Sequence, residues 1–433
     1  MEQKGIDFSK VIFADLHIHS KYSRACSKDL NIPNLVKWAR IKGLGLLGTG
    51  DFTHPIWLEE IKKLKEEDGI YYYDNFPFIL SSEISLIYTK NGRGRRIHLV
   101  YLAPNIEAVE KINSWLDTRG RRDYDGRPIF GISCRDFAAK MEEIDTRIEV
   151  IPAHCWTPWF GIFGSEGGFD KMSEAFEDKY YLIHAIETGI SSDPQMNWKI
   201  KELDNKAIVS FSDAHSFWPF RIGREATIFN KLSGKLSYDE ILQQIRENDI
   251  VGTIETDPAY GKYHYDGHRK CNFSCSPEET KKLNGICPVC GKPLTIGVDY
   301  RVSEISKLGI ANHDKKKFFY KVLPLHEIIS LAIGTGVNSK KVWEIYNSLI
   351  DKFDNEFNVM LFAPKEEIAK AINNELLSGL IIQNREGNIN VRAGYDGVYG
   401  KALIGGKEVG VEDDSVIKTE VKKNIEVVQK KLF

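Results

Sequence analysis

The chain has 433 residues, of which 42% are hydrophobic and 28% charged, and its formal net charge at pH 7 is −2. This length is enough for two or three ordinary cores, and no apolar stretch approaches the roughly 20 residues of a membrane span. We therefore expect no membrane partner. The near-neutral charge excludes a protein surface that is basic overall and binds nucleic acid in that way, so contact with DNA or RNA must come from local basic patches. Two such patches are Arg93, Arg95 and Arg96, and Arg119, Arg121 and Arg122.

Residues 1–5 lack the basic-then-apolar pattern of a secretory signal, and three of the seven cysteines, Cys26, Cys134 and Cys155, are scattered singly. Both features indicate a reducing compartment, so we expect a cytoplasmic protein.

The first half of the chain contains short apolar runs that each predict a buried strand. They lie at 11–14, 44–47, 76–80, 97–102, 148–153, 181–186 and 207–211. Amphipathic stretches at 32–41, 57–65 and 137–144 predict helices between most of them. Alternation of strands and helices predicts a parallel sheet, and seven units indicate a closed or nearly closed α/β barrel.

Polar side chains of the kinds that can bind a metal stand at or near the end of every run. They are His17, His19, Asp51, His54, Glu83, His98, His154, Glu187, Asp213 and His215. Alternate side chains of an extended chain share a face, so His17 and His19 can point at one spot, and Asp213 and His215 can do the same. These four are the predicted catalytic residues, and Asp51, Glu83, His98 and His154 the further predicted metal ligands.

A lone histidine near a strand end is more often a hydrogen-bonded core or surface residue than a ligand, and we interpret His184 in that way. The full set is hard to explain without a shared cation, because buried carboxylates and imidazoles are costly unless they are paired or coordinated.

Residues 11–230 resemble the polymerase and histidinol phosphatase (PHP) superfamily. The motifs that carry the resemblance are residues 15–20, Gly50-Asp51, 82–85, His98-Leu99, 152–154 and 212–215. The resemblance implies a metal-dependent phosphoesterase on a distorted seven-stranded barrel with up to three metal ions. Two departures stand out: Arg24-Ala25-Cys26, where the family has an acidic residue or histidine, and Asp51-Phe52 in place of Asp-His. One ligand is missing or is supplied by Cys26 or His54; we favour Asp51 as a ligand over His54.

Four cysteines form the second motif, Cys271-x3-Cys275 followed by Cys287-x2-Cys290. Two closely spaced pairs of thiols predict a tetrahedral structural zinc site, since the alternative of two disulfides does not suit a reducing compartment. Such a site folds a small module that has little core of its own.

Beyond this module, three-four spacing of apolar residues predicts helices at 325–332, 341–353 and 365–376. A glycine-rich loop at 392–401 carries Tyr395, Tyr399 and Lys401, a composition that suits contact with a nucleic-acid strand. A tight hairpin would need the same glycines. We predict three domains: a PHP-type barrel at 1–255, a zinc-binding module at 256–300, and a mostly helical region at 301–433.

The order of the three parts, together with Gly48-Thr49-Gly50-Asp51 and the Gly-Tyr-Asp-Gly loop at 394–397, resembles the endonuclease Q family over nearly the whole chain. The resemblance implies a DNA repair endonuclease that cuts on the 5′ side of uracil, hypoxanthine, xanthine and abasic sites. We expect one structural zinc, and two or three ions of zinc, magnesium or manganese in the barrel. The alternatives are a PHP-type small-molecule phosphatase and a non-catalytic zinc-bearing DNA-binding scaffold.

The C-terminus also resembles a ligand of the sliding clamp (PCNA). Gln429 and Leu432 fit the opening of the clamp-binding pattern, but Phe433 follows directly and the usual aromatic pair is missing. A charged helix tail is the alternative interpretation. Resemblance to endonuclease Q, some members of which are thought to work with the clamp, favours clamp binding.

Overall fold

The computed structural model describes residues 7–231, 234–312, 316–404 and 407–410. Within this part of the chain, none of the helices combines the length and the apolar character that a membrane crossing demands. The predicted clamp-binding segment at 429–433 lies outside the described residues.

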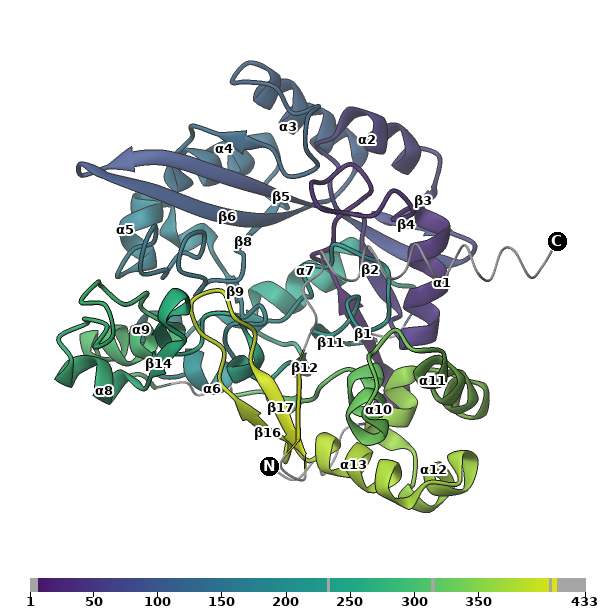
Figure 1. The fold of residues 1–433 in the computed structure, drawn as a ribbon. Coiled ribbons are helices and arrows are strands. Elements are labelled where there is room, and N and C mark those ends of the chain that lie inside the picture. Colours follow the sequence, from purple (N-terminus) through teal and green to yellow (C-terminus); the bar gives the residue numbers. More distant parts are fainter. Residues whose placement is uncertain (1–6, 232–233, 313–315, 405–406, 411–433) are drawn as a thin grey trace.

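A large sheet forms the centre of the molecule, and every apolar run of the first half supplies a strand (Figure 1). These strands are β1 (Val11–Asp15), β2 (Leu46–Gly48), β5 (Phe76–Lys90), β6 (Arg93–Ala103), β8 (Glu149–Pro152), β9 (Ala185–Glu187) and β10 (Ala207–Val209). The other strands of the main sheet are β3 (Lys65–Glu67), β4 (Ile70–Tyr73), β7 (Ile129–Phe130), β11 (Ala226–Asn230), β12 (Gly252–Glu255) and β15 (Phe318–Lys321).

The main sheet has the order β15-β12-β11-β1-β2-β5-β4-β3, with β6 and β7 beside β5 and β8 beside β6. The pairs β1–β2 and β2–β5 are parallel, but β5–β6, β6–β8 and β1–β11 are antiparallel. The prediction of a parallel sheet is therefore wrong in part. The cause is local: residues 91–92 form a tight turn between β5 and β6, where the prediction had separate strands of a parallel sheet. The strands β9 and β10 form a separate parallel pair, so the closed barrel stays a prediction.

Alternate residues of these strands belong to two apolar clusters. Ile12, Val100, Ile151, Ala185 and Val209, from five different strands, pack into one buried cluster. Val11 and Phe13 face the other cluster, which reaches the surrounding helices. Burial on both faces explains why the strands read as continuous apolar runs.

Seven helices lie in this part of the described chain: α1 (Ile32–Lys42), α2 (Pro55–Ile61), α3 (Ile106–Asp117), α4 (Cys134–Ile144), α5 (Met172–Phe176), α6 (Pro194–Asn197) and α7 (Tyr238–Arg246). Local signals set the ends of α1: the Asn31 side chain accepts a hydrogen bond from the Asn34 amide, and Gly43 ends the helix at φ +98°. The predicted helix at 57–65 ends early, because Lys65 already belongs to β3.

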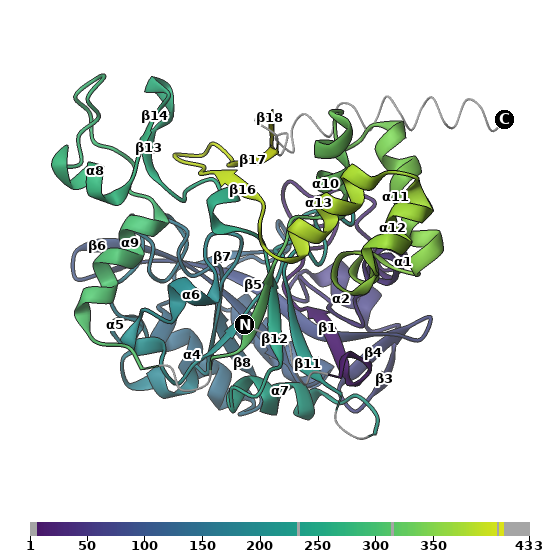
Figure 2. The same cartoon turned by 90° about the horizontal axis from the view of Figure 1, so that it is seen from below.

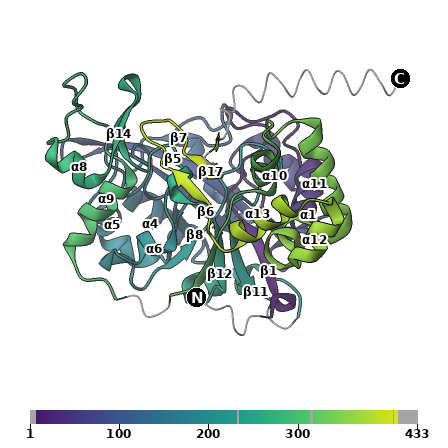
Figure 3. The same ribbon diagram turned by 60° about the horizontal axis from the view of Figure 1, so that its bottom comes forward.

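The cysteine-rich module and the helical region lie on the same side of the sheet, with a hairpin between them (Figures 2 and 3). The module contains β13 (Asp266–His268), β14 (Phe273–Cys275), α8 (Pro277–Lys282) and α9 (Val298–Ile305). The helical region contains α10 (Leu325–Ile333), α11 (Lys340–Phe353), α12 (Lys365–Ile372) and α13 (Glu375–Arg385). The hairpin consists of β16 (Asn390–Arg392) and β17 (Lys401–Ile404), and β18 (Lys407–Gly410) pairs with β17 as the third strand of a small antiparallel sheet.

The helical region packs against the first part of the chain and shares its main sheet. Lys42 and Glu356, both buried, form an ion pair of 2.7 Å between α1 and the segment after α11. The strand β15, from the region predicted as helical, pairs in parallel with β12. The predicted helix at 365–376 is two helices, because Asn373 adopts a left-handed φ of +49° and Asn374 caps the next helix.

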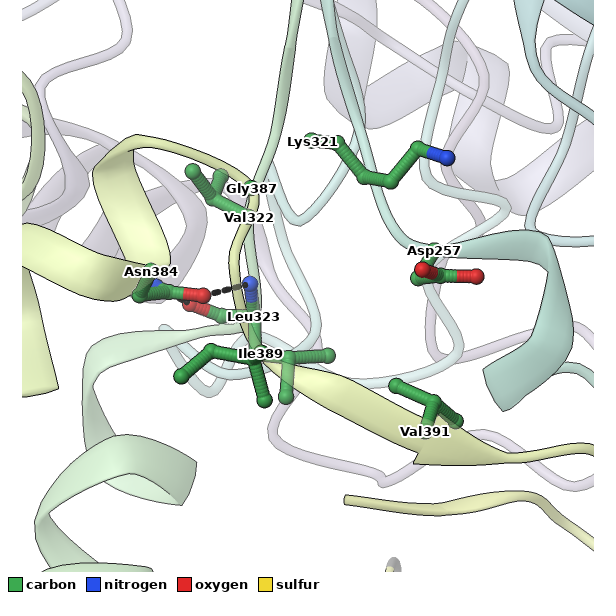
Figure 4. A pocket seen from close by; sticks show the side chains of 8 residues that line it. All are labelled: Asp257, Lys321, Val322, Leu323, Asn384, Gly387, Ile389 and Val391. Atoms are coloured by element: carbon green, nitrogen blue, oxygen red, sulfur yellow. Dashed lines mark hydrogen bonds between the residues drawn. The ribbon is translucent and has the colours of Figure 1, made fainter. Parts of the chain in front are cut away.

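A pocket marks the boundary between β15 and the helical region (Figure 4). Its lining residues are Asp257, Lys321, Val322, Leu323, Asn384, Gly387, Ile389 and Val391. The Asn384 carboxamide accepts a hydrogen bond from the Leu323 amide and donates one to the Leu323 carbonyl, each at 2.9 Å. This pair of bonds fixes α13 to the end of β15.

Candidate metal centre

Two groups of metal-binding side chains overlap at one residue. His17, His19, Glu83 and Asp213 each place one donor atom within 4.8 Å of the others, and Glu83 forms a second such group with His98 and His154. The sharing of one carboxylate by two groups suits a pair of neighbouring cations. The structure thus brings together six of the eight predicted barrel ligands.

Strand pairing creates this arrangement. The residues after β1 pair with the segment after β10, because Ile18 bridges Ala214 and the His19 amide donates to the Ala214 carbonyl at 3.0 Å. In the β5–β6 hairpin Ser85 lies opposite His98, so Glu83, two residues earlier, projects from the same face.

Three predicted site residues have left-handed backbone angles. The φ values are +30° at His154, +48° at Asp213 and +47° at Asp51. These positions follow strands, where the chain turns sharply and the side chain is redirected. Non-glycine residues in this region are strained, and such strain is concentrated at functional sites.

Two carboxylates outside the groups orient the histidines. Glu187 accepts a hydrogen bond from His17 Nδ1 at 2.9 Å, and Asp51 accepts one from His19 Nδ1 at 2.9 Å. Each imidazole therefore turns its Nε2 toward the centre. His17 Nε2 is buried without a hydrogen-bond partner, 3.4 Å from Glu83 Oε2. An orphaned nitrogen aimed at a cluster of carboxylates fits a metal ion, and the pairing of histidine with carboxylate is typical of metal sites.

The charges of the centre also suit a cation. Burial works against ionisation of Glu83, yet His98, Arg127 and His17 hold the pKa of its carboxyl well below the usual value. Burial opposes ionisation of Asp213 too, and there His215 and His17 lower the pKa. Both acids are therefore ionised at neutral pH, the state in which a carboxylate binds a divalent metal.

Asp51 and His215 lie beside the two groups and outside them. Both oxygens of Asp51 accept hydrogen bonds, Oδ1 from His19 and Oδ2 from the Ser20 amide at 2.6 Å and from the Ser23 hydroxyl at 2.9 Å. His215 Nδ1 donates to the Asp213 carbonyl at 2.9 Å. The ligand roles of Asp51 and His215 stay predictions. The hydrogen bond from His19 gives Asp51 a different task, which is to orient the His19 imidazole.

Cys26 and His54, the alternatives for the missing ligand, are also outside the groups. Burial raises the pKa of the Cys26 thiol to about 12, which disfavours a thiolate. His54 stacks on Tyr22 and donates from Nε2 to the Asp123 carbonyl at 3.2 Å. His184 pairs with Glu149 at 3.0 Å, which agrees with its structural interpretation.

Sequence reasoning did not find two residues of the site. Glu187 was noted only as a polar strand end, although its position directly after an apolar run was the available signal. Arg127 reaches Glu83 at 3.0 Å from a loop that showed no pattern.

Three of the four cysteines of the second motif come together with a histidine. Donor atoms of His268, Cys271, Cys287 and Cys290 all lie within 4.8 Å of one another. Burial of the Cys287 thiol raises its pKa, but hydrogen bonds from the backbone amides of Val289 and Cys290 outweigh burial and lower the pKa to about 6. The lowered pKa favours the thiolate, which is the form that binds zinc. Cys275 lies outside this group, and its Sγ contacts the Thr280 hydroxyl at 3.2 Å.

The glycine-rich loop forms the tip of the β16–β17 hairpin and packs on the cysteine-rich module. Tyr395 donates to Asn272 Oδ1 at 2.8 Å, and Asp396 accepts from the Arg269 amide at 2.6 Å. A Cβ at Gly394 or Gly400 would collide with backbone carbonyls of residues 259–261. The glycines are therefore required by packing, and nucleic-acid contact by Tyr395, Tyr399 and Lys401 stays a prediction.

A buried pair of carboxyl groups, where β11 begins and β12 ends, gives a prediction for stability. Glu225 and Glu255 are fully buried and both contact the Ser210 hydroxyl. Burial raises the pKa of Glu225 to about 8 from 4.5. The unfolded chain therefore loses this proton near pH 4.5 and the folded chain near pH 8, so ionisation lowers stability as pH rises between these values, by at most about 1.4 kcal/mol per pH unit.

We expect Glu225→Gln to remove this loss. Chemical denaturation of the variant and the wild type at pH 5 and pH 8 checks it. The variant should gain stability over the wild type as pH rises, and an equal pH dependence of both proteins would contradict the protonated state of Glu225.

Imidazole and carboxylate donors gathered at the strand ends of an α/β sheet are typical of a metal-dependent hydrolase. The lesion-specific endonuclease PfuEndoQ of Pyrococcus furiosus superimposes with a TM-score of 0.80 and 30% identity, over 91% of this chain and 95% of that one. An endonuclease Q complex with a 27-mer duplex that carries an abasic lesion matches with the same score and identity, over 91% and 96%. The chain therefore belongs to the endonuclease Q family and is a DNA-cleaving hydrolase.

Two proteins are similar to this chain in sequence, one of them over almost the whole chain. Protein YqxK of Bacillus subtilis is 27% identical over 412 residues, which cover 90% of this chain and 99% of that protein. Protein MJ0043 of Methanocaldococcus jannaschii is 33% identical over 288 residues, 65% of this chain, but the match spans only 34% of that protein's length. The family described as the MJ0043 C-terminal domain matches residues 324–388, the helical region.

Proposed function

We propose that this protein is a metal-dependent DNA repair endonuclease that hydrolyses the phosphodiester on the 5′ side of deaminated bases and abasic sites. The observation that carries the proposal is the pair of donor groups that share Glu83, in a chain that matches an endonuclease Q bound to an abasic duplex over 91% of its length.

The side chains of the centre have distinct tasks in this proposal. His17, His19 and Asp213 with Glu83 would hold one divalent cation, and His98 and His154 with Glu83 a second one. Bound cations lower the pKa of water and polarise the scissile phosphate. Glu187 and Asp51 hold the imidazoles in the tautomer that leaves Nε2 free to bind.

Deaminated bases differ from their parents in an exchanged donor and acceptor on the pairing edge. An enzyme reads this edge most simply by flipping the nucleotide out of the duplex, which costs a few kcal/mol and less at a mismatched or missing base. Flipping therefore costs less at a mispaired uracil, hypoxanthine or xanthine and at an abasic site. The preference for these lesions is thus part of the proposal.

The added parts suit a DNA partner. We propose a structural zinc at the second motif, with Cys271, Cys287 and Cys290 as ligands and Cys275 or His268 as the fourth. The β16–β17 hairpin packs on this module and carries Tyr395, Tyr399 and Lys401, where stacking and charge would meet the DNA strand.

A panel of substrates tests the proposal. End-labelled duplexes with a single uracil, hypoxanthine, xanthine or abasic site are incubated with the protein and Mg²⁺, Mn²⁺ or Zn²⁺, beside a plain duplex and a phosphate monoester. We expect a single cut at each lesion and an intact plain duplex. Hydrolysis of the monoester alone would support a small-molecule phosphatase, and binding without any cleavage would support a DNA-binding scaffold.

A further inference from the structure

Arg127 stands at the mouth of the metal centre. Its Nη1 lies 3.0 Å from Glu83 Oε2, the carboxylate that both donor groups share, while a quarter of its side chain (25%) is exposed to solvent. Arg127 therefore contacts the buried centre of the site and also reaches the solvent.

Strand pairing places the guanidinium there. The short strand β7 runs parallel to β5 with Ile129 opposite Ser85, so Arg127, two residues before Ile129, lies beside Glu83, two residues before Ser85. The Ser85 amide donates to the Pro128 carbonyl at 3.0 Å and continues the ladder. The position of Arg127 is thus set by the sheet that also positions Glu83.

The loop before β7 is held tightly over the centre. Gly126 packs directly against Asp51 and Ser23, where a Cβ would collide with both side chains. Its carbonyl accepts a hydrogen bond from the Thr53 hydroxyl at 3.0 Å, and the Arg127 amide donates to Asp125 at 3.2 Å. A loop built in this way presents Arg127 in a fixed direction, as a preorganised electrostatic group requires.

The contact with Glu83 uses one donor of a group that has five. Guanidinium is also the group that matches a phosphate in two-point hydrogen bonds and keeps its charge at every physiological pH. The partly exposed face of Arg127 opens beside the carboxylate around which a scissile phosphate would lie.

We propose that Arg127 is a catalytic residue that binds a nonbridging oxygen of the scissile phosphate, an inference that rests on the proposed nuclease function. In the reaction the oxygen of a water molecule forms a bond to phosphorus, the bond from phosphorus to the 3′ oxygen breaks, and that oxygen leaves with a proton. Arg127 keeps all its protons and stabilises the negative charge that grows on the nonbridging oxygen.

The first test compares Arg127→Ala, Arg127→Lys and the matched control Arg246→Ala in single-turnover cleavage of an abasic duplex. Arg246 is similarly exposed (29%) and pairs at 2.8 Å with Glu149, which is as buried as Glu83, but it lies outside the donor groups. We expect Arg127→Ala to cut about 100-fold more slowly or worse. Arg127→Lys should recover part of the rate, and Arg246→Ala should cut at the wild-type rate.

The second test needs no turnover. A product-like nicked duplex is bound with either a 5′-phosphate or a 5′-hydroxyl at the lesion, and metal content is measured in each protein. The wild type should prefer the phosphate, and Arg127→Ala should lose that preference while it keeps the wild-type metal content. Loss of bound metal, or a preference equal to that of the wild type, would overturn the inference and leave Arg127 as a structural partner of Glu83.

The two tests separate this inference from the proposed function. If the wild type cuts the lesion duplex and Arg127→Ala cuts it equally fast, the inference fails and the function stands. If the wild type cuts no duplex, the function fails, and the nicked duplexes still decide whether Arg127 binds a phosphate.

Discussion

Replacement of Glu83 by glutamine should nearly abolish cleavage and lower the metal content of both donor groups. Glu83 is the carboxylate that the two groups share, and it is fully buried beside His17, His19 and His98. Glutamine keeps the shape but removes the negative charge that two cations would share. We expect a loss in rate on the order of 1,000-fold, the upper range for removal of a preorganised electrostatic group.

Metal analysis and single-turnover cleavage of the lesion duplex check this result. Glu187→Gln is the control, because Glu187 is equally buried but lies outside both groups and acts through His17. We expect the control to lose only about 10- to 100-fold in metal affinity or rate. A Glu83→Gln protein with full metal content and normal rate would show that the metal centre is elsewhere.

The second large effect is expected from Cys287→Ser. Cys287 is fully buried, and the small apolar cluster around it also contains Cys275 and Leu294. A module with so small a core depends on its metal, since a structural zinc contributes about 10–16 kcal/mol of folding free energy. The variant should lose zinc and bind DNA at least tenfold more weakly, while the barrel keeps its cations.

Zinc release, DNA affinity and barrel metal content are measured on the same preparation. Cys155→Ser is the matched control, because Cys155 is buried away from the module, with its Sγ near Asn197. Cys275→Ser and His268→Ala, measured in parallel, identify the fourth ligand. A Cys287→Ser protein that retains zinc, stability and DNA affinity would refute the structural role of the motif.

The sequence predicted the strands well, because strands buried on both faces appear as continuous apolar runs. It could not predict their pairing. The turn at Asn91-Gly92 joins β5 and β6 directly, yet both runs looked like separate strands of a parallel sheet, since periodicity does not reveal strand direction. In the same way β15 joined the main sheet from far along the chain, a contact that no local pattern could reveal.

The candidate ligands were predictable because histidines and carboxylates recur at strand ends. Which of them meet depends on angles that the sequence does not display. His154 and Asp213 enter the groups through left-handed turns, whereas Asp51, also in such a turn, uses both oxygens in hydrogen bonds to neighbouring residues. Arg127 depends on the pairing of a two-residue strand and left no trace in the sequence.

Product analysis in heavy-oxygen water tests the central claim most directly. A duplex with one abasic site is cut by the metal-loaded protein in H₂¹⁸O, and the fragments are weighed by mass spectrometry. Hydrolysis at a metal centre predicts one cut 5′ to the lesion, a 3′-hydroxyl on one fragment, and a 5′-phosphate with a single ¹⁸O on the other. A 3′-phosphate, an unsaturated sugar end or a product without ¹⁸O would contradict the account.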